Sequence, residues 1–262
     1  MELFQSIILG ITQGVSEFLP ISSSAHLVLI PYLFHWQYNG LVFDTALHFG
    51  TVMAIVFYFY KDWVNIIKSG FKSPTKSDLP HNFLWQILIA TIPAGIAGLI
   101  LENYVEKYFH SPLLLAINLI VFGLILWLTD KLAKSKQEIN KISFGQSLLV
   151  GLSQCLALIP GVSRSGITMV ASRGLGLKRE DSARFSFLLG TPAMIGAFLT
   201  EARKLQPSDL NLPFFLGVIF SAIAGFLAIK FLLNYLKKSN FSIFLWYRII
   251  LAVIVMAVFF RW

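Results

Sequence analysis

Long apolar runs, separated by short polar segments, dominate the chain from end to end. Six of these runs approach the ~20 residues that an α-helix needs to cross a bilayer. They lie roughly at 41–60, 84–101, 112–129, 185–200, 212–232 and 243–262. The pattern predicts an all-α, polytopic membrane protein with six transmembrane helices.

Two further apolar regions, 3–36 and 144–176, are each interrupted in the middle, by LPISSSA and IPGVSRSG. The halves on either side of these breaks are too short to cross a bilayer. Proline and polar residues at that depth free backbone groups that hydrocarbon cannot satisfy, and such backbone is tolerated only inside protein or beside a wet cavity. We therefore predict two re-entrant helical hairpins, each entering and leaving the membrane on one side.

The basic residues between the runs predict the orientation. With six spans and two hairpins, four loops that hold fifteen Lys and Arg residues fall on one side, and two loops that hold three fall on the other. The rich loops are 61–83, 130–143, 173–184 and 230–242, and the poor ones are 102–111 and 201–211. The positive-inside rule makes the rich side cytoplasmic, so the first hairpin opens outward and the second inward.

Composition agrees with a single membrane domain over 1–262. Of the 262 residues, 56% are hydrophobic and 13% are charged, whereas a soluble domain carries about 25% charged residues. The net charge of +8 sits in short loops between apolar runs. That distribution indicates topology signals and contact with anionic membrane lipids rather than a nucleic-acid partner. Cys155 is the only cysteine, which excludes an intramolecular disulfide and a cysteine cluster for zinc.

The two interrupted regions also resemble each other. A shift of 140 aligns Gly50-Thr51 with Gly190-Thr191, and a shift of 141 aligns six positions of the first hairpin with six of the second. Gln5, Ser6, Gly10, Gln13, Ser22 and Ser24 then meet Gln146, Ser147, Gly151, Gln154, Ser163 and Ser165. The chain thus reads as two repeats, 1–130 and 142–262, each a hairpin plus three spans. Because three is an odd number of spans, the second repeat is inverted in the membrane relative to the first. Inverted repeats with broken helices place a site near the midplane, where the breaks meet.

Chemistry-bearing residues gather at these breaks. The first break has Glu17, Ser22, Ser23, Ser24 and His26, and the second has Ser163, Arg164 and Ser165. Each residue type also has a structural interpretation. Glu17 is compatible with a solvated helix end and Arg164 with its counter-ion, His26 with a buried hydrogen-bonded ring, and the serines with helix caps. Asp44 and His48, four residues apart at the start of the first span, are expected to support the site.

The combination indicates an anion site, with phosphate favoured. Arg164 offers a planar fork of donors, and serine hydroxyls with the backbone N–H groups of PGVSRSG can cradle anionic oxygens. A carboxylate with a histidine can activate a nucleophile or hold a divalent cation. From the residues alone, the ligand is either a lipid phosphate that reaches the site from the bilayer or a soluble anion in transport.

At these residues the chain resembles a known family. Four segments are similar to segments of the bacterial undecaprenyl-diphosphatases of the bacitracin-resistance type. In chain order they are QGVSEFLPISSSAHL, FDTALHFGT, PGVSRSGITM and FSFLLGTPAM. The resemblance runs over nearly the whole chain. It implies hydrolysis of a polyisoprenyl diphosphate lipid to the monophosphate, which recycles the cell-wall lipid carrier, at the outer face of the bacterial cytoplasmic membrane. It also implies dependence on a divalent cation, Mg²⁺ or Ca²⁺.

The resemblance implies roles for individual residues. Arg164 and the serine-rich breaks, with Ser22, Ser24, Ser163 and Ser165, hold the diphosphate, and the cation lies near Glu17. Gln13 stands where many members have glutamate, and it is assigned to substrate binding. Ser23, or a water in its place, is the nucleophile, and Glu17 and His26 serve as base and acid in either order. The rival interpretation is a lipid-phosphate flippase or anion transporter, and a third is a lipid-binding sensor.

Overall fold

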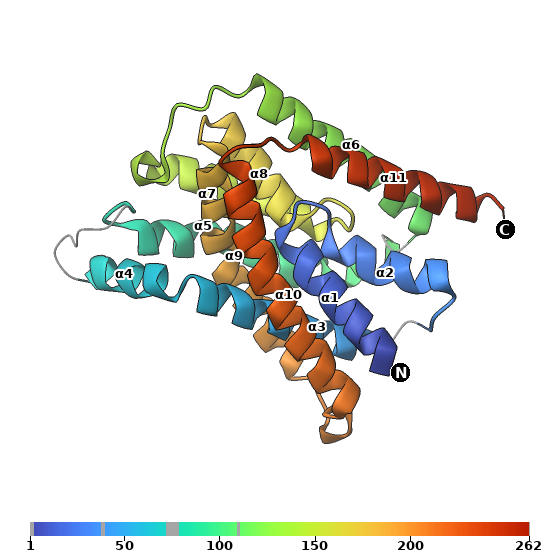
Figure 1. Ribbon diagram of the computed structural model, residues 1–262. Helices are drawn as coiled ribbons and strands as arrows, with labels where there is room; N and C mark the ends of the chain where they lie inside the picture. The colour runs from blue at the N-terminus through green and yellow to red at the C-terminus, as the bar shows by residue number, and fades with distance from the viewer. Residues whose placement is uncertain (1–2, 38–39, 72–78, 109–110, 262) are drawn as a thin grey trace.

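The computed structural model describes residues 3–37, 40–71, 79–108 and 111–261, and these are folded almost entirely into helices (Figure 1). In this part of the chain there is no β-strand, only an isolated bridge between Gln137 and Leu177. The all-α prediction is therefore confirmed. Lys72, Lys76 and Trp262, which the sequence analysis assigned to a loop and to the last span, lie outside the described residues.

The α-helices follow one another along the chain with short connections. They are α1 (Leu3–Phe18), α2 (Ser23–Phe34), α3 (Gly40–Tyr58), α4 (Tyr60–Phe71), α5 (Phe83–Tyr108), α6 (Pro112–Leu132), α7 (Phe144–Ser153), α8 (Arg164–Gly174), α9 (Arg179–Ala202), α10 (Leu212–Leu236) and α11 (Ser242–Phe259). Short 3-10 helices cover Ile139–Lys141, Gln154–Leu158 and Pro207–Asp209.

Five helices of the described chain, α5, α6, α9, α10 and α11, are long and apolar enough to cross a membrane. The first predicted span, 41–60, differs. It corresponds to α3, whose 19 residues come close to the ~20 that a span needs, and α4 follows it after a bend of 70° at Phe59. The hydrophobic pattern predicts a loop after residue 60, and the structure has the helix α4 there instead.

The two interrupted regions form helical hairpins. In the first, α1 and α2 meet at the turn Leu19–Ser22, and in the second, α7 with its 3-10 extension meets α8 at the turn Ile159–Ser163. At 1.5 Å per residue, the 16 residues of α1 span about 24 Å and the 12 of α2 about 18 Å, less than the ~30 Å hydrocarbon core. In Figure 1 the open end of the first hairpin lies near the two chain termini.

Both hairpins turn through the same unusual backbone conformation. Ser22 precedes α2 with φ of 74° and Ser163 precedes α8 with φ of 76°. Positive φ is uncommon for a residue with a side chain, because the Cβ atom crowds the backbone. The two serines are also the ones that the shift of 141 aligns, so the sequence similarity of the hairpins extends to their turns.

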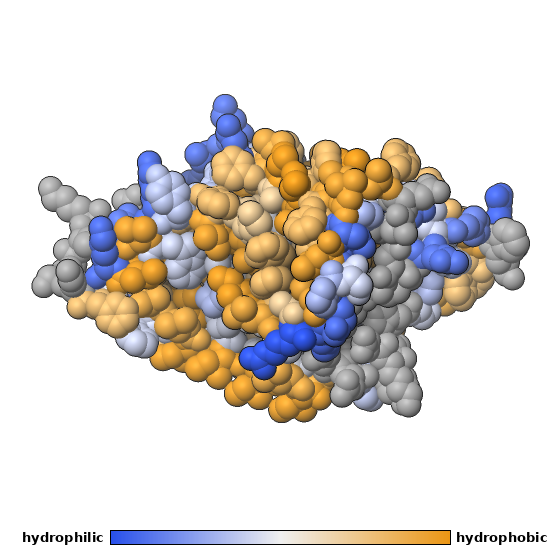
Figure 2. Space-filling view, turned by 90° about the horizontal axis from the view of Figure 1, so that it is seen from below, coloured by the Kyte–Doolittle hydropathy of each residue, from blue (hydrophilic) through white to orange (hydrophobic). Residues whose placement is uncertain are grey.

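Small residues bring the hairpin close to its neighbours. A Cβ atom on Gly10 or Gly14 of α1 would collide with backbone atoms of α10 at Gly217 and Ser221. Such small-residue contacts are how membrane helices approach closely. On the outside, large apolar side chains such as Leu99 and Ile100 are exposed, and apolar residues cover much of the face shown in Figure 2. This surface suits lipid rather than water.

Candidate active site

The tips of the two hairpins meet inside the bundle. Arg164, the first residue of α8, donates from Nη2 to Oε1 of Glu17, near the end of α1, at 2.7 Å. Ser165 Oγ donates to the carbonyl oxygen of Leu19 at 3.3 Å. The carboxylate and the guanidinium that the sequence analysis placed on separate breaks are therefore in direct contact, although 147 residues separate them.

Glu17 is held by donors on three sides. Its second oxygen, Oε2, accepts from Ser23 Oγ at 2.6 Å and from Gln13 Nε2 at 3.1 Å. Only 8% of the Glu17 surface is exposed, and a buried carboxylate without partners is strongly unfavourable. The cation and the two neutral donors stabilise the ionised form, so this site holds a carboxylate that can accept a proton from Ser23.

Arg164 is only partly satisfied by its surroundings. Nη2 also lies 2.8 Å from the sulfur of Met194, and the guanidinium packs so closely on Gly190 that a Cβ atom there would collide with it. Within the described residues, Nη1 of Arg164 is buried and has no hydrogen-bond partner, and the same holds for Oε1 of Gln13. A buried unpaired donor costs about 1–3 kcal/mol, which indicates a site completed by an external acceptor.

The serines form matching pairs at the two tips. Ser22 and Ser24 join through their hydroxyls at 3.2 Å, and Ser163 and Ser165 do the same at 3.1 Å. Ser163 Oγ also accepts from the backbone N–H of Gly166 at 3.1 Å, an N-cap bond, whereas Ser22 makes no such bond. Ser24 is exposed and the other three are buried. Ser22 and Ser24 flank Ser23 in the chain, and Ser163 and Ser165 flank Arg164. Their hydroxyl groups can bind anionic oxygens at the two tips.

His26 is engaged away from Glu17. Its Nδ1 lies 2.7 Å from the carbonyl oxygen of Ser22, and its Nε2 lies 2.7 Å from the hydroxyl of Tyr247. A carbonyl only accepts, so Nδ1 carries a proton, and in the neutral imidazole Nε2 accepts from Tyr247. The ring also stacks on Tyr247, with centroids 5.6 Å apart. His26 thus joins the first hairpin to α11, and its role as acid or base stays a prediction.

The ring of a different histidine, His48 on α3, lies beside the carboxylate. Its Nε2 is 3.9 Å from Oε2 of Glu17, and its Nδ1 lies 2.8 Å from the carbonyl oxygen of Asp44. Because Nδ1 must donate to that carbonyl, the neutral ring presents the lone pair of Nε2 toward Glu17. The sequence predicts a supporting role for His48, and the structure places its ring next to the carboxylate of Glu17.

Arg248 of α11 is a site residue that the sequence analysis missed. It is fully buried, and it donates from Nε to the carbonyl oxygen of Pro20 at 2.7 Å and from Nη2 to that of Val162 at 3.2 Å. These carbonyls belong to the turns of different hairpins, so one guanidinium ties the two tips together. An arginine within an apolar run is rare and faces the interior, which is the signal that would have found it.

The same contacts bear on a divalent cation. No cluster of three or more His, Cys, Asp or Glu side chains exists in the described chain, so a site made of protein ligands alone is not supported there. Mg²⁺, however, is commonly held by one or two carboxylates together with substrate phosphates. The carboxylate of Glu17 and the unpartnered Oε1 of Gln13, adjacent on α1, are oxygen ligands that fit such a shared ion.

Fold and site together define a class: a polytopic α-helical membrane protein with a buried polar site, built where two broken helical segments meet. The chain matches the model of one family, described as bacitracin resistance protein BacA, over residues 6–254. Because that match covers nearly all 262 residues, the chain belongs to this family.

Curated relatives agree with the family match. The chain is 49% identical to the undecaprenyl-diphosphatase of Pelotomaculum thermopropionicum over 259 residues, which cover 98% of this chain and 97% of the relative. It is 46% identical to the undecaprenyl-diphosphatase of Moorella thermoacetica, with 99% and 98% covered. For the one from Caldicellulosiruptor bescii the identity is 48%, with 98% and 97% covered. The similarity therefore extends over whole chains.

Proposed function

We propose that this protein hydrolyses undecaprenyl diphosphate to undecaprenyl phosphate and inorganic phosphate. The relatives at 46–49% identity carry this activity in their names. The observation that carries the proposal is the buried pair Glu17–Arg164, in which Arg164 Nη1 lacks a partner among the described residues. A carboxylate beside a hydroxyl, next to a cation with a spare donor, suits phosphoryl transfer.

Substrate binding follows from the donors at the two tips. Arg164 Nη1 donates to a phosphoryl oxygen, and the hydroxyls of Ser22, Ser24, Ser163 and Ser165, together with N–H groups at the starts of α2 and α8, donate to others. The positive ends of two helix dipoles favour the same anion. The polyisoprenyl tail stays in the bilayer between helices, because its transfer into water would expose a long hydrocarbon chain.

Bond changes centre on Ser23 and Glu17, whose side chains are 2.6 Å apart. Two nucleophiles fit. Ser23 Oγ attacks the terminal phosphorus, Glu17 takes its proton, and the bond to the bridging oxygen breaks with its electron pair leaving on undecaprenyl phosphate. Water then hydrolyses the phosphoserine and frees inorganic phosphate. Alternatively, a water in place of the Ser23 hydroxyl attacks directly and gives the same products in one step.

The remaining groups support this chemistry. A divalent cation held by Glu17 and Gln13 would neutralise negative charge on the phosphoryl oxygens. His48 is positioned to exchange a proton with Glu17 through a small movement or one water, because its Nε2 lies 3.9 Å away. His26 acts as an acid only if its bond to Tyr247 or Ser22 opens, so its first role here is to hold the hairpin turn.

The membrane arrangement is part of the proposal. We infer two inverted repeats, 1–130 and 142–262, with the first hairpin re-entrant from outside and the second from the cytoplasm. The matching turns at Ser22 and Ser163 support the repeat. The loop charges support a basic cytoplasmic side, so the site opens toward the outer face of the bacterial cytoplasmic membrane.

Activity in detergent tests the enzymatic function against the transport alternative. Purified protein in detergent separates no compartments, so a flippase or transporter has no measurable function there. We expect release of inorganic phosphate from undecaprenyl diphosphate, and its suppression by a chelator with restoration by added Mg²⁺ or Ca²⁺. Binding of the lipid without phosphate release would contradict the proposal and favour a transporter or a sensor.

Labelling of single cysteines tests the orientation. Ser208, in the loop before α10, and Lys238, in the loop after it, are both exposed. In a Cys155→Ser background, an impermeant thiol reagent added to intact cells should label Ser208→Cys and leave Lys238→Cys unlabelled until the cells are opened. The reverse pattern would place the site on the cytoplasmic side.

A further inference from the structure

The helix α4 combines an amphipathic surface with a position outside the catalytic site. We propose that α4 is an interfacial helix that lies in the plane of the membrane, inserts an apolar stripe into the lipid, and binds anionic phosphate headgroups through Lys61 and Lys68. The bound partner is thus an anionic phospholipid of the bilayer surface. This inference rests on the contacts of α4 alone and does not depend on the hydrolysis reaction.

The first observation is the pattern of exposure along α4. Tyr60, Val64, Ile67 and Phe71 are 55%, 44%, 49% and 70% exposed. Their spacing of four, three and four residues places them on one side of an α-helix. Four large apolar side chains on the outer side of α4 would be unfavourable in water. The same arrangement is typical of an interfacial helix, whose apolar side enters the lipid.

Packing against the rest of the protein fixes the direction of this stripe. On the other side of α4, Ile66 is 1% exposed and belongs to the main hydrophobic core, and Ser69 is buried. Asp62 forms an ion pair with Arg184 of α9. Because these contacts hold one face of the helix against the protein, the apolar stripe cannot turn inward and stays outside.

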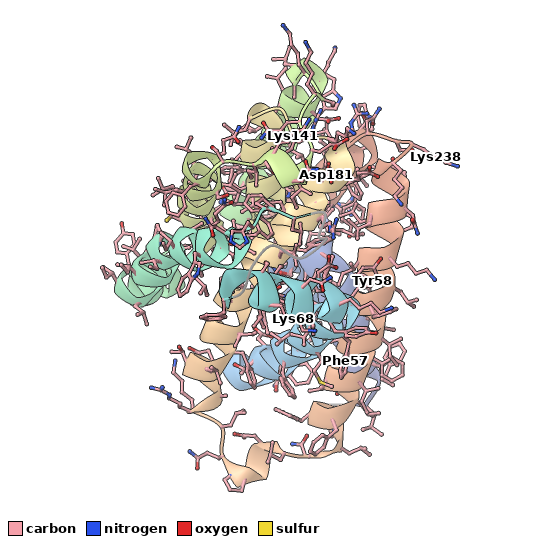
Figure 3. All side chains as sticks on the ribbon, turned by 90° about the vertical axis from the view of Figure 1, so that its left-hand side faces the viewer. Phe57, Tyr58, Lys68, Lys141, Asp181 and Lys238 are labelled. Atoms are coloured by element: carbon pink, nitrogen blue, oxygen red, sulfur yellow. The ribbon has the colours of Figure 1, made fainter. Side chains whose placement is uncertain are left out.

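A row of polar residues runs beside the stripe. Lys61, Asn65 and Lys68 are exposed and follow one another at intervals of four and three residues. A lysine ammonium next to an apolar stripe reaches the level of the lipid headgroups, where anionic phosphates attract it. In Figure 3, Lys68 lies near the middle of the view, and Lys141 and Lys238, which are loop lysines of the basic side, lie toward its top.

Aromatic residues lie at both ends of the helix. Phe71 packs edge to face on Trp85, with centroids 5.8 Å apart, and Trp85 donates from Nε1 to the carbonyl oxygen of Gly70 at 3.2 Å. Lys61 lies over the ring of Tyr60, 5.7 Å from its centroid. Trp and Tyr concentrate at the boundary between headgroups and hydrocarbon, so this boundary runs along α4.

The direction of α4 excludes a simple continuation of the span. It leaves α3 at a 70° bend, and its 12 residues extend only about 18 Å. A helix that turns by this angle away from a spanning helix runs closer to the membrane plane than to the normal. The exposed stripe and the lysine row therefore lie at a single depth rather than at increasing depths.

Spin labels on the full-length protein in nanodiscs test the insertion. Single cysteines at Val64, Ile67 and, as the polar control, Asn65 are labelled in a Cys155→Ser background, and collisions with oxygen and a water-soluble nickel complex are measured. We expect labels at Val64 and Ile67 to favour oxygen to a similar extent, and the label at Asn65 to favour nickel. Equal nickel access at all three positions would overturn the proposal, and so would Val64 and Ile67 labels shielded from both reagents, since a second copy of the chain would then cover them.

A change of lipid tests the headgroup contact. With the label at Ile67, nanodiscs of phosphatidylcholine are compared with nanodiscs that also contain phosphatidylglycerol. We expect the anionic lipid to raise the oxygen preference, and the double variant Lys61→Gln/Lys68→Gln to lose this rise. The control Arg203→Gln/Lys204→Gln, in an exposed loop that precedes α10, should keep it. A rise that persists without the two lysines, or no rise in the parent protein, would disprove their role.

Discussion

The two hairpins share a turn but differ in the charge they bring to it. Each places a serine at φ near +75° before its outgoing helix, and each joins that serine to another two residues on. At the positions that the shift of 141 aligns, however, Glu17 of the first hairpin corresponds to Leu158 of the second, and Ser23 corresponds to Arg164. The common backbone brings two helix starts together, whereas the diverged side chains make them complementary.

This difference has a physical reason. Two identical tips would bring like charges or no charges into a buried site, and like charges so close cannot both stay ionised. One carboxylate and one guanidinium instead neutralise each other, and Nη1 of Arg164, which has no partner among the described residues, leaves the guanidinium a donor for an anion. Changes to each hairpin, and to the Arg248 contact that joins them, should separate these contributions, with effects that decrease in that order.

Removing the charge of the first hairpin should have the largest effect. Glu17→Gln keeps the shape of the side chain but cannot take a proton from Ser23, so turnover should fall about 100-fold or more, the usual scale for a positioned acid or base. Phosphate release from the detergent-solubilised protein measures it. Glu138→Gln is the matched control, because Glu138 also pairs with a cation, Lys178 at 2.5 Å, but at the surface. This variant should leave turnover almost unchanged. Normal turnover in Glu17→Gln would remove Glu17 from the mechanism.

Changing the cation of the second hairpin tests its geometry. Arg164→Lys keeps the charge but loses the planar fork, so one group can no longer bind both Glu17 and a phosphoryl oxygen. We expect Arg164→Lys and Arg164→Ala both to lower kcat/KM by at least about tenfold, since the lost contact strengthens as charge develops. Arg203→Lys, in an exposed loop, serves as control. A fully active Arg164→Lys would return Arg164 to a structural ion pair.

Loosening the tie between the hairpins should reduce both activity and stability. Arg248 donates to carbonyl oxygens of both turns, and Arg248→Lys leaves at least one of these buried carbonyls without its donor. That loss should lower the free energy of unfolding by about 1–3 kcal/mol and lower turnover about tenfold through misplaced tips. Thermal unfolding and phosphate release on the same samples separate the two effects. An unchanged unfolding temperature would show that the turns hold without Arg248.

The smallest expected effect compares the two turns directly. Glycine adopts positive φ without the penalty that serine pays, roughly 1 kcal/mol. Ser22→Gly and Ser163→Gly gain equally from this relief and each lose one serine–serine bond, but only Ser163→Gly also loses an N-cap bond. We therefore expect Ser22→Gly to be the more stable variant by a few tenths of a kcal/mol, measured by chemical unfolding in detergent. The opposite order would show that the Ser22 hydroxyl stabilises its turn more than the Ser163 hydroxyl does.

Much of this protein could be predicted from the sequence, because hydrocarbon imposes length and hydropathy on every spanning helix. Five predicted spans correspond to α5, α6, α9, α10 and α11. The proline and serine breaks predict the hairpins, because backbone groups freed at that depth must be buried in protein or line a wet cavity. The cost of burying Glu17 and Arg164 marks both as site candidates in the sequence, with an ion pair between them as one interpretation.

Only the tertiary structure decided which side chains complete the site. The sequence assigns His26 to acid–base chemistry and His48 to a supporting role. The rotation of α3 about its axis, however, puts His48 within 3.9 Å of Glu17, while Tyr247 of α11 engages His26. Arg248 reaches both turns from more than 80 residues away in the chain. Local hydrophobic patterns fix where a helix begins and ends, whereas its rotation and its distant neighbours depend on packing among all the helices at once.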